Sequence, residues 1–453
     1  MRTLAVALGW VGIAAAANTT ATKQVTFNRD VLPVLQKNCQ ECHRPGEVAP
    51  MSFMSYQETR PWAKAIKAAV LTKKMPPWLA DPKYGHFVNE RRLSETEMNT
   101  LVNWADTGAA EGDARDKPAP VRFVEGWNIK PDLVFEMPQS FDVPASGILE
   151  YQYVVIPTHF DKDTWVTAAE VRPGNRAVVH HVIAFIRPPG SQWMKDAKPG
   201  VPFVPVTHDR DANGAAIRRN VQTASADPQQ QRNSSVLATE NLVGYAPGLQ
   251  PQRYDIVPGA AKLIPAGSDI VFQLHYTTNG KPATDRTKIG LTLAAETPKY
   301  RYLTMSAGQQ KLEIPPNDGN YESHSQAVFN HDVELVWLMP HMHLRGKDFL
   351  YEAVYPTGEK QTLLSVPKYD FNWQLGYDEA QPVLMPKGSR LECTAHHDNS
   401  PNNPANPNPN ATVRWGDQSW EEMMIGWFGV VVDANVKPED VIARPARKPA
   451  SSD

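Results

Sequence analysis

Five histidines of the 453-residue chain lie in three strand-like stretches, at spacings suited to binding metal ions. His180 and His181 occur in AVVHHVIAF, His275 in VFQLHYTTNG, and His341 and His343 in LMPHMHLRG. Residues i and i+2 of a strand face the same side, so His341 and His343 can hold one ion together. Adjacent residues face opposite sides. His180 and His181 can therefore share an ion only at a distorted or edge position, for example through different ring nitrogens.

A sulfur ligand beside these histidines would narrow the choice of metal. Imidazole suits copper, zinc, iron and nickel, whereas an added thioether favours copper, especially Cu(I). Each histidine pair alone is weak evidence, because a single strand histidine is usually an ordinary polar residue. The ordered set HH, HY, HxH and then the methionine-bearing SWEEMMIGWF is more informative. Met342, between the two histidines of HMH, is expected to point away from the ion. His396 and His397, in a polar Asn/Pro-rich stretch, are interpreted as surface residues.

A second chemistry is indicated by NCQECHRPG, which contains Cys39, Cys42 and His43. C-x-x-C-H is the attachment motif of haem c, in which two thiols bind the haem and the histidine becomes the proximal iron ligand. One alternative is a redox C-x-x-C, which would lie in a βαβ context that is absent here. The other is half of a zinc site, which needs four ligands, and no second Cys or Cys/His pair lies nearby. We therefore interpret the motif as a haem c site.

The predicted sixth haem ligand is Met75 in KKMPPW, where two prolines stiffen the loop that holds the thioether. A methionine ligand raises the reduction potential of a haem. Met51, Met54 and Met98 are the rivals, although Met98 has the position of a helix core residue.

The N-terminal sequence indicates export. Residues 1–17 have the pattern of a signal peptide cleaved near Ala17, because Arg2 is followed by about ten apolar residues and a small-residue site. This run is shorter than the roughly 18–20 residues that a membrane span needs. Only Cys393 remains beside the two haem cysteines, which excludes a disulfide framework. We expect a periplasmic or secreted protein without stable membrane insertion.

The elements around the C-x-x-C-H motif are expected to be helices, at residues 28–37, at 61–73 and from a capping box of Ser94 and Glu97 to Gly108. In the second of these, Trp62, Ile66 and Val70 fall on one face. Three helices around this motif resemble the small all-α class I cytochrome c fold. We assign that domain to residues 23–113, followed by a charged, proline-rich linker at 114–125.

From residue 126 onward, short β-rich runs such as YQYVVIP and TWVTAAEV alternate with Pro, Gly and Asn turns. They predict two all-β domains, antiparallel sandwiches or jelly rolls, at 126–297 and 298–445. The 41% hydrophobic residues suffice for large cores, and a net charge of −3 gives no reason to expect a nucleic-acid partner. A polar stretch at about 190–262 is interpreted as an inserted lid or interaction loop.

The ordered histidines resemble the copper type II, ascorbate-dependent monooxygenases, which include the peptidylglycine- and dopamine-hydroxylating enzymes. The resemblance covers about residues 150–430, through VVHHVIAF, FQLHYTTNG, HMHLRGK and SWEEMMIGWF. It implies two linked jelly rolls with one copper each. The implied ligands of the electron-transfer copper are His180, His181 and His275. The implied ligands of the oxygen-activating copper are His341, His343 and Met423, with Met424 as the alternative to Met423.

The chain departs from this family at several positions. Met339 stands where the peptide-amidating branch has an arginine that grips the substrate carboxylate, and Trp427 stands where a tyrosine is found. A glycine-extended peptide is therefore not the expected substrate. Cys393 occupies a cysteine-bearing family position but has no partner, so the disulfides of the relatives are missing.

The fusion of the two chemistries suggests a function. We expect haem c to take electrons from a periplasmic donor and pass them to the copper of His180, His181 and His275. The second copper would bind O2 and hydroxylate a C–H bond of an unidentified small molecule. Two alternatives remain open. One is a non-catalytic haem and copper electron-transfer or copper-binding protein, and the other is a structural body that holds zinc.

Overall fold

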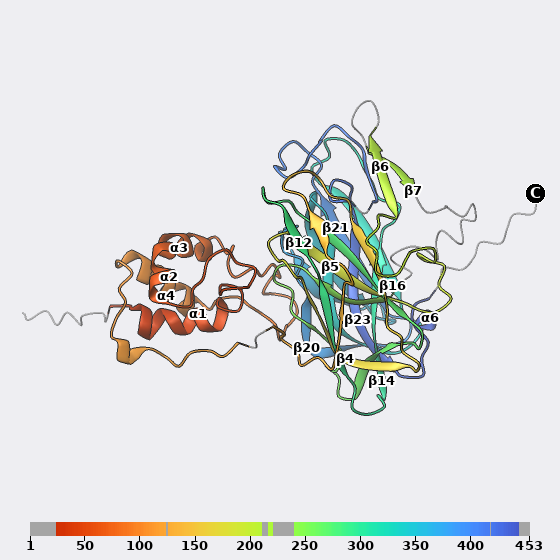
Figure 1. Cartoon of the computed structure of the whole chain (residues 1–453), viewed down its shortest axis with the longest axis horizontal. Coiled ribbons are helices and arrows are strands. Elements are labelled where there is room, and N and C mark those ends of the chain that lie inside the picture. Colours follow the sequence, from red (N-terminus) through yellow and green to blue (C-terminus); the bar gives the residue numbers. More distant parts are fainter. Residues whose placement is uncertain (1–23, 124–125, 211–215, 221–239, 417, 444–453) are drawn as a thin grey trace, which may run out of the picture.

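The computed structural model places a group of helices beside a larger body of β-strands (Figure 1). It describes residues 24–123, 126–210, 216–220, 240–416 and 418–443. The predicted signal peptide and part of the predicted insertion at 190–262 lie outside the described residues. Strands far outnumber helices in the described chain, which confirms the predicted β-rich body.

The helices lie mainly before residue 117. Their bounds are η1 Phe27–Val31, α1 Leu32–Asn38, α2 Tyr56–Thr59, η2 Arg60–Trp62, α3 Ala63–Leu71, α4 Glu95–Asp106, η3 Ala114–Asp116 and α6 Pro438–Val441. The predicted capping box is confirmed, because Ser94 and Glu97 each accept a hydrogen bond from the other's backbone N–H. Gly108, at a φ of +91°, follows the end of α4 as expected. No helix of the described residues has both the length and the apolar character to cross a bilayer.

The helices enclose a core of their own. Phe27, Leu35 and Trp104 are at most 1% exposed, and Ile66 and Val70 of α3 pack in the same cluster. Burying side chains of this kind contributes about 1.5–3 kcal/mol each. The predicted inner face of residues 61–73 is wrong at one position. Trp62 is 41% exposed, because it ends the 3-10 turn η2, which shifts it out of phase with α3.

Among the described residues, thirteen strands precede residue 294, and they form the first sandwich. One sheet has the order β1-β13-β4-β10 and faces a second with the order β3-β11-β5-β8, while β2 with β12 and β6 with β7 form separate pairs. The strands are β1 Leu133–Glu136, β2 Phe141–Val143, β3 Gln152–Pro157, β4 Thr164–Arg172, β5 Val179–Arg187, β6 Val206–Arg210, β7 Ala216–Asn220, β8 Glu240–Tyr245, β9 Gln252–Arg253, β10 Ala260–Ile264, β11 Asp269–Tyr276, β12 Ala283–Asp285 and β13 Lys288–Leu293.

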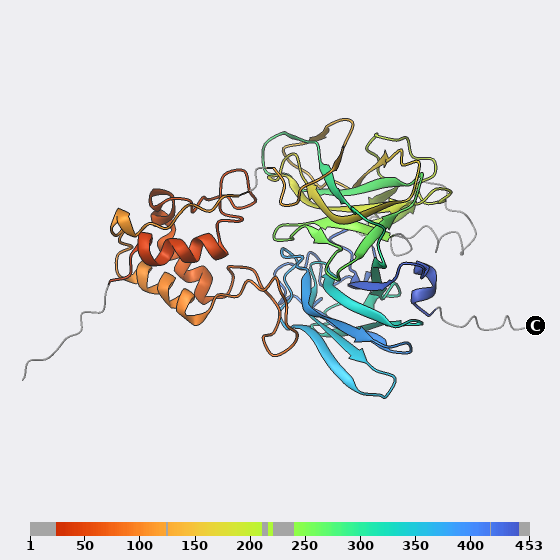
Figure 2. The same ribbon diagram turned by 90° about the horizontal axis from the view of Figure 1, so that it is seen from below.

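The remaining strands form the second sandwich, with sheet orders β14-β23-β17-β20 and β16-β21-β18-β19. These strands are β14 Tyr300–Gly308, β15 Glu313–Ile314, β16 Tyr321–Val328, β17 Val333–Met342, β18 Gly346–Val354, β19 Lys360–Val366, β20 Tyr377–Met385, β21 Arg390–His397, β22 Val413–Arg414 and β23 Met424–Asp433. The two lobes are visible in Figure 2, with the first sandwich in yellow to green and the second in cyan to blue.

The two sandwiches are joined by a continuous sheet. β10 pairs in parallel with β14, through Ala260 opposite Tyr300 and Ala261 opposite Arg301. One sheet path therefore runs β1-β13-β4-β10-β14-β23-β17-β20 across the predicted boundary at 297/298. The lobes are held together by backbone hydrogen bonds as well as by side-chain packing.

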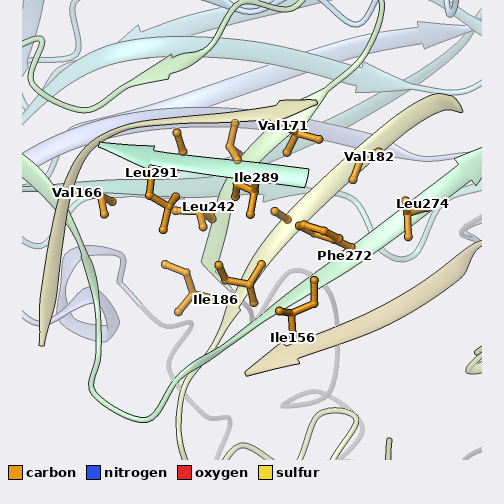
Figure 3. Packing of buried hydrophobic residues seen from close by; sticks show 14 of the residues in the cluster. Ile156, Val166, Val171, Val182, Ile186, Leu242, Phe272, Leu274, Ile289 and Leu291 are labelled. Atoms are coloured by element: carbon orange, nitrogen blue, oxygen red, sulfur yellow. The ribbon is translucent and has the colours of Figure 1, made fainter. Parts of the chain in front are cut away.

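The core of the first sandwich reaches into the second. Ile156, Val182, Phe272 and Leu291 lie in the apolar cluster between its two sheets (Figure 3). The same cluster includes Trp337 of β17, Ile425 and Trp427 of β23, and Met423, which directly precedes β23. A separate core fills the second sandwich, and it contains Met342 and Met424. The two faces of β17 and β23 thus pack into two different cores.

Part of the N-terminal region belongs structurally to the second sandwich. Ala80 and Phe87 are buried in the core of that sandwich. The Val88 N–H donates to the Asp378 carbonyl at 2.9 Å, and the Ala380 N–H donates to the His86 carbonyl at 2.7 Å. The chain after the Met75 loop therefore extends the edge of β20 before it returns to α4.

Candidate metal centres

His180 and His181 meet at a β-bulge. In the pairing of β5 with β11, His181 lies opposite His275, but Tyr276 lies opposite Val179. His180 is the extra residue, and a bulge releases its side chain from strict alternation. The Nδ1 atoms of His180 and His181 are 3.2 Å apart. Two adjacent histidines need a distorted position in order to share an ion, and the bulge provides it. The two rings approach each other through Nδ1 in both cases, and not through different nitrogens.

His275 completes a cluster of three imidazoles. One ring nitrogen from each of His180, His181 and His275 lies within 4.8 Å of the others, close to the spacing of nitrogens about 2 Å from one ion. The buried Nδ1 of His275 has no hydrogen-bond partner among the described residues. The ring of Tyr151 covers the cluster, with centroids 5.4 Å from His181 and 4.8 Å from His275. The donor set fits one metal ion, which would satisfy a nitrogen whose isolation otherwise costs about 1–3 kcal/mol.

Burial keeps this cluster uncharged. It lowers the pKa of His180 and His181, and it lowers that of His275 to about 3, with a further contribution from its histidine neighbour. Neutral imidazoles offer free lone pairs at neutral pH, so metal binding needs little proton release.

Replacement of His275 by alanine is expected to reduce the metal content by one ion per chain. The matched control is His324→Ala, because His324 is exposed on β16 and bonded to Glu322. Metal analysis of protein matured in the periplasm checks both variants. An unchanged metal content in His275→Ala would contradict the three-histidine site.

His341 and His343 share one face at the end of β17. Their ring centroids are 5.2 Å apart, and the rings are nearly perpendicular. The Nδ1 of His341 lies 2.9 Å from Gln374 Oε1, and the Nδ1 of His343 lies 3.3 Å from the Glu421 carbonyl. Since both partners are acceptors, each Nδ1 carries the proton and each Nε2 carries the free lone pair. The Nε2 of His343 is buried and has no partner among the described residues, which fits a metal ligand.

The two candidate methionines lie in different environments. β17 pairs with β23 so that His341 is opposite Ile425 and Met342 is opposite Met424. Met424 belongs to the core of the second sandwich together with Met342, and its Sδ accepts a hydrogen bond from Ser325 Oγ at 3.3 Å. Met423 instead lies in the cluster that contains Ile425, on the side of His341. Met342 and Met424 thus lie away from the histidines, which favours Met423 over Met424.

A buried glutamate, which the sequence did not single out, connects the two parts of this site. Glu422 is fully buried, and its carboxylate accepts hydrogen bonds from the backbone N–H groups of His343, Met423 and Arg345. Burial raises the pKa of Glu422 to about 7, although the three N–H groups favour the charged form. One side chain thus fixes the end of β17 to the start of β23.

His397 corrects the surface interpretation of the HH pair in ECTAHHD. His396 is half-buried and bonded to Asp348, but His397 is fully buried at the end of β21. Its Nε2 lies 3.4 Å from the Met423 carbonyl. Because polar residues follow it, the sequence does not show that His397 is the last residue of a strand. Side chains alternate between the two faces of β21, and His397 lies on the buried face.

One aromatic ring contacts both histidine groups. The ring of Phe371 stacks on His180 at a centroid distance of 5.6 Å and meets His343 nearly edge-on at 6.0 Å. The groups are close enough for His341 and His343 to lower the pKa of His181 further, after burial and the nearer histidines. No sequence pattern marks Phe371 or Gln374, because both lie in the irregular connection between β19 and β20.

The C-x-x-C-H residues form a turn at the end of α1. The N–H groups of Cys42 and His43 donate to the Cys39 carbonyl at 3.1 and 2.9 Å. The Nδ1 of His43 lies 3.3 Å from the Met51 carbonyl, and its ring stacks on Phe53. That hydrogen bond leaves Nε2 free, as a proximal haem ligand requires. Burial raises the pKa of Cys39 to about 12, opposite to the shift that makes a thiol redox-active.

Met75 lies just after α3 and is half-buried. Its rivals Met51 and Met98 pack against the helical core, whereas Met75 is not part of that cluster. The assignment of Met75 as the sixth ligand stays a prediction.

Comparisons with known proteins add little to this geometry. No family model and no curated protein matches the chain. Among solved structures, one of infectious bursal disease virus, Gx strain, is 7% identical with a TM-score of 0.17, covering 71% of this chain and 77% of that one. The VP54 protein of PBCV-1 is 8% identical with a TM-score of 0.21, covering 71% and 99%. The Macrobrachium rosenbergii nodavirus is 10% identical with a TM-score of 0.17, covering 71% and 96%. Scores of this size carry no argument on fold or function.

Proposed function

We propose that the protein is a copper-dependent monooxygenase, related to the copper type II, ascorbate-dependent enzymes, that carries its own haem c domain. One observation supports it above all. Phe371 contacts both histidine groups, and each group contains a buried ring nitrogen without a partner among the described residues.

When bound, haem c and two coppers would supply one-electron transfer and reduction of O2. The overall reaction consumes one O2, two electrons and two protons, and it converts a substrate C–H group to C–OH with release of one water. The electrons would come from a periplasmic donor. These requirements match a chain with one haem motif and two separate metal sites.

The two ligand sets suit different tasks. His180, His181 and His275 offer three neutral imidazoles beneath Tyr151, which is a closed environment for a one-electron carrier. His341, His343 and Met423 offer two imidazoles and a thioether, a set that favours Cu(I). Gln374 and the Glu421 carbonyl fix the tautomers of His341 and His343. Such partners hold the ring orientation when substrate and O2 enter.

The helical region supports the haem part of the proposal. Its helices surround one apolar core, and the turn at Cys39 presents two thiols and His43 on one short segment. We propose a class I cytochrome c domain with Met75 as the sixth ligand. The two sandwiches would then be the jelly rolls of the monooxygenase.

The walls near the second site indicate an uncharged substrate. Met339 and Trp427 lie directly opposite each other on β17 and β23, two positions along from His341 and Ile425. The nearby Arg345 is not available to a carboxylate, because it donates to Asn399 Oδ1 at 2.9 Å and to the Trp420 carbonyl at 3.0 Å. We therefore propose an apolar small molecule in place of a peptide.

The test is oxygen uptake by the holoprotein with a reduced one-electron donor and a panel of apolar substrates. The proposal expects one iron and two coppers per chain, substrate-dependent O2 consumption and an alcohol that contains oxygen from ¹⁸O2. Two bound coppers without substrate-dependent uptake would favour the electron-transfer or copper-binding alternative. Zinc in place of copper would overturn the proposal.

A further inference from the structure

The loop after the C-x-x-C-H motif does not project into solvent but docks on the first sandwich. Three arginines bind the carboxylate of Glu47. Arg44 lies 3.0 Å and Arg172 3.5 Å from its Oε1, and Arg176 contacts its Oε2. These four side chains are only 11–16% exposed. Arg172 also binds Glu170 at 2.8 Å, which anchors the network to the end of β4.

This network differs from an ordinary surface ion pair. Exposed pairs contribute about 0–1 kcal/mol, but a partly buried carboxylate with several cations is harder to remove, because its loss leaves like charges together without solvent. Arg172 and Arg176 come from the first sandwich, whereas Arg44 and Glu47 come from the segment after His43. Glu47 is therefore the residue on which attachment of that segment depends.

The docked segment forms one wall of a small cleft. Glu41, Cys42 and Arg44 line one side, and residues 244–251 line the other. The guanidinium of Arg176 lies 6.0 Å from the ring centre of Tyr245. The buried hydroxyl of Tyr245 has no partner among the described residues. The cleft thus places Tyr245 between the Cys42 segment and the sheet behind it.

That sheet leads directly to the first histidine group. Tyr245 of β8 is paired with Val182 of β5, and Val182 follows His181 in the chain. Arg176, in the turn before β5, lies four residues before His180. A single hydrogen-bonded strand pair therefore separates the cleft from the cluster of His180, His181 and His275.

We infer that Glu47, Arg172 and Arg176 form a latch that holds the C-x-x-C-H segment against the first sandwich beside β8. The existence of the latch does not depend on the proposed function. Only the purpose that we assign to it rests on that function. That purpose is to keep the distance between the haem motif and the first copper site short and constant.

The test uses the full-length holoprotein and compares Glu47→Gln with Glu41→Gln. Glu41 is an exposed residue on the same cleft, so the two variants lose the same charge in the same segment. Amide hydrogen exchange is measured in peptides that cover 240–250 and 176–182. Glu47→Gln is expected to speed exchange there about tenfold, while Glu41→Gln behaves like the wild type. Equal exchange in all three proteins would overturn the latch.

A second measurement needs no variant. Raising the salt concentration from about 50 mM to about 500 mM shortens the screening length and should speed exchange in the same peptides of the wild type, but not in Glu47→Gln. The internal contact of residues 86–88 with β20 serves as the unaffected reference, because it consists of backbone hydrogen bonds. Neither readout requires copper or O2, so failure of the monooxygenase proposal would leave this result intact. A salt response in Glu47→Gln as large as that of the wild type would contradict the latch.

Discussion

Met423→Ala is expected to abolish oxygen consumption in a protein that still folds. Met424→Ala is expected to retain oxygen consumption and to lower the free energy of unfolding. Met423 lies on the side of His341, at the start of β23, so its loss removes a proposed sulfur ligand from the second site. Since changes even to residues behind the metal ligands cost about 10–100-fold, oxygen use should fall at least about 100-fold. Met424 fills the core of the second sandwich, and its truncation should lower the free energy of unfolding by about 2–5 kcal/mol.

Three measurements separate the two variants. Oxygen uptake reports on the second site, copper content reports on both sites, and urea denaturation reports on the core. The haem spectrum, which depends on neither methionine in this proposal, serves as the internal control for maturation. Normal oxygen uptake by Met423→Ala would exclude Met423 as a ligand. Loss of uptake in a folded Met424→Ala would show that the two methionines had been assigned the wrong way round.

Site residues that lie on one strand can be predicted from the sequence more readily than site residues that come from different elements. The i, i+2 spacing places His341 and His343 on one face without knowledge of the fold. Two adjacent histidines can share an ion only at a distorted or edge position. Only the pairing with β11 shows that this position is a bulge at His180. Phe371 and Gln374 reach the site from a loop without periodicity, so no local signal identifies them.

Domain boundaries show the same limit. Composition separates helical residues from β-rich ones, and the capping box and Gly108 mark the last helix of the N-terminal region. Composition cannot show that Phe87 packs in the core of the second sandwich or that β10 pairs with β14 across the boundary between the sandwiches. Contacts between residues far apart in the sequence depend on which surfaces remain uncovered after each unit folds, and a single sequence does not contain that information in local form.

Two buried glutamates should respond in opposite directions to the same substitution. The carboxylate of Glu422 accepts hydrogen bonds from three backbone N–H groups and lies beside Arg345. Glutamine would place an NH2 group against some of these donors. We expect Glu422→Gln to lower the free energy of unfolding by about 2–4 kcal/mol, because buried donors lose their acceptor. The second copper should be lost as well, since Glu422 fixes His343 to Met423.

Glu379 is the matched case. It is 6% exposed on β20, its Oε1 has no partner among the described residues, and burial together with Asp378 raises its pKa to about 8. A glutamate whose folded pKa lies above its unfolded value of 4.5 binds its proton more tightly in the folded state. Its contribution to stability is therefore fully present below about pH 4.5 and is lost as the pH rises through about 8. Glutamine remains neutral throughout, so Glu379→Gln should stabilise the protein by about 1–3 kcal/mol at pH 8 and have little effect at pH 5.

Urea denaturation of both variants at pH 5 and pH 8 tests this contrast, with copper content as the second readout. The same change from carboxylate to amide should destabilise one protein at pH 8, above the pKa of about 7 of Glu422, and stabilise the other at the same pH. If Glu379→Gln destabilised the protein as much as Glu422→Gln does, burial of an unpartnered carboxylate could not be the main effect of Glu379 on stability. If Glu422→Gln retained full stability and both coppers, the backbone connection between β17 and β23 would not depend on its carboxylate. The opposite signs would show that the hydrogen-bond partners of a buried acid, more than its depth, decide what it contributes to the fold.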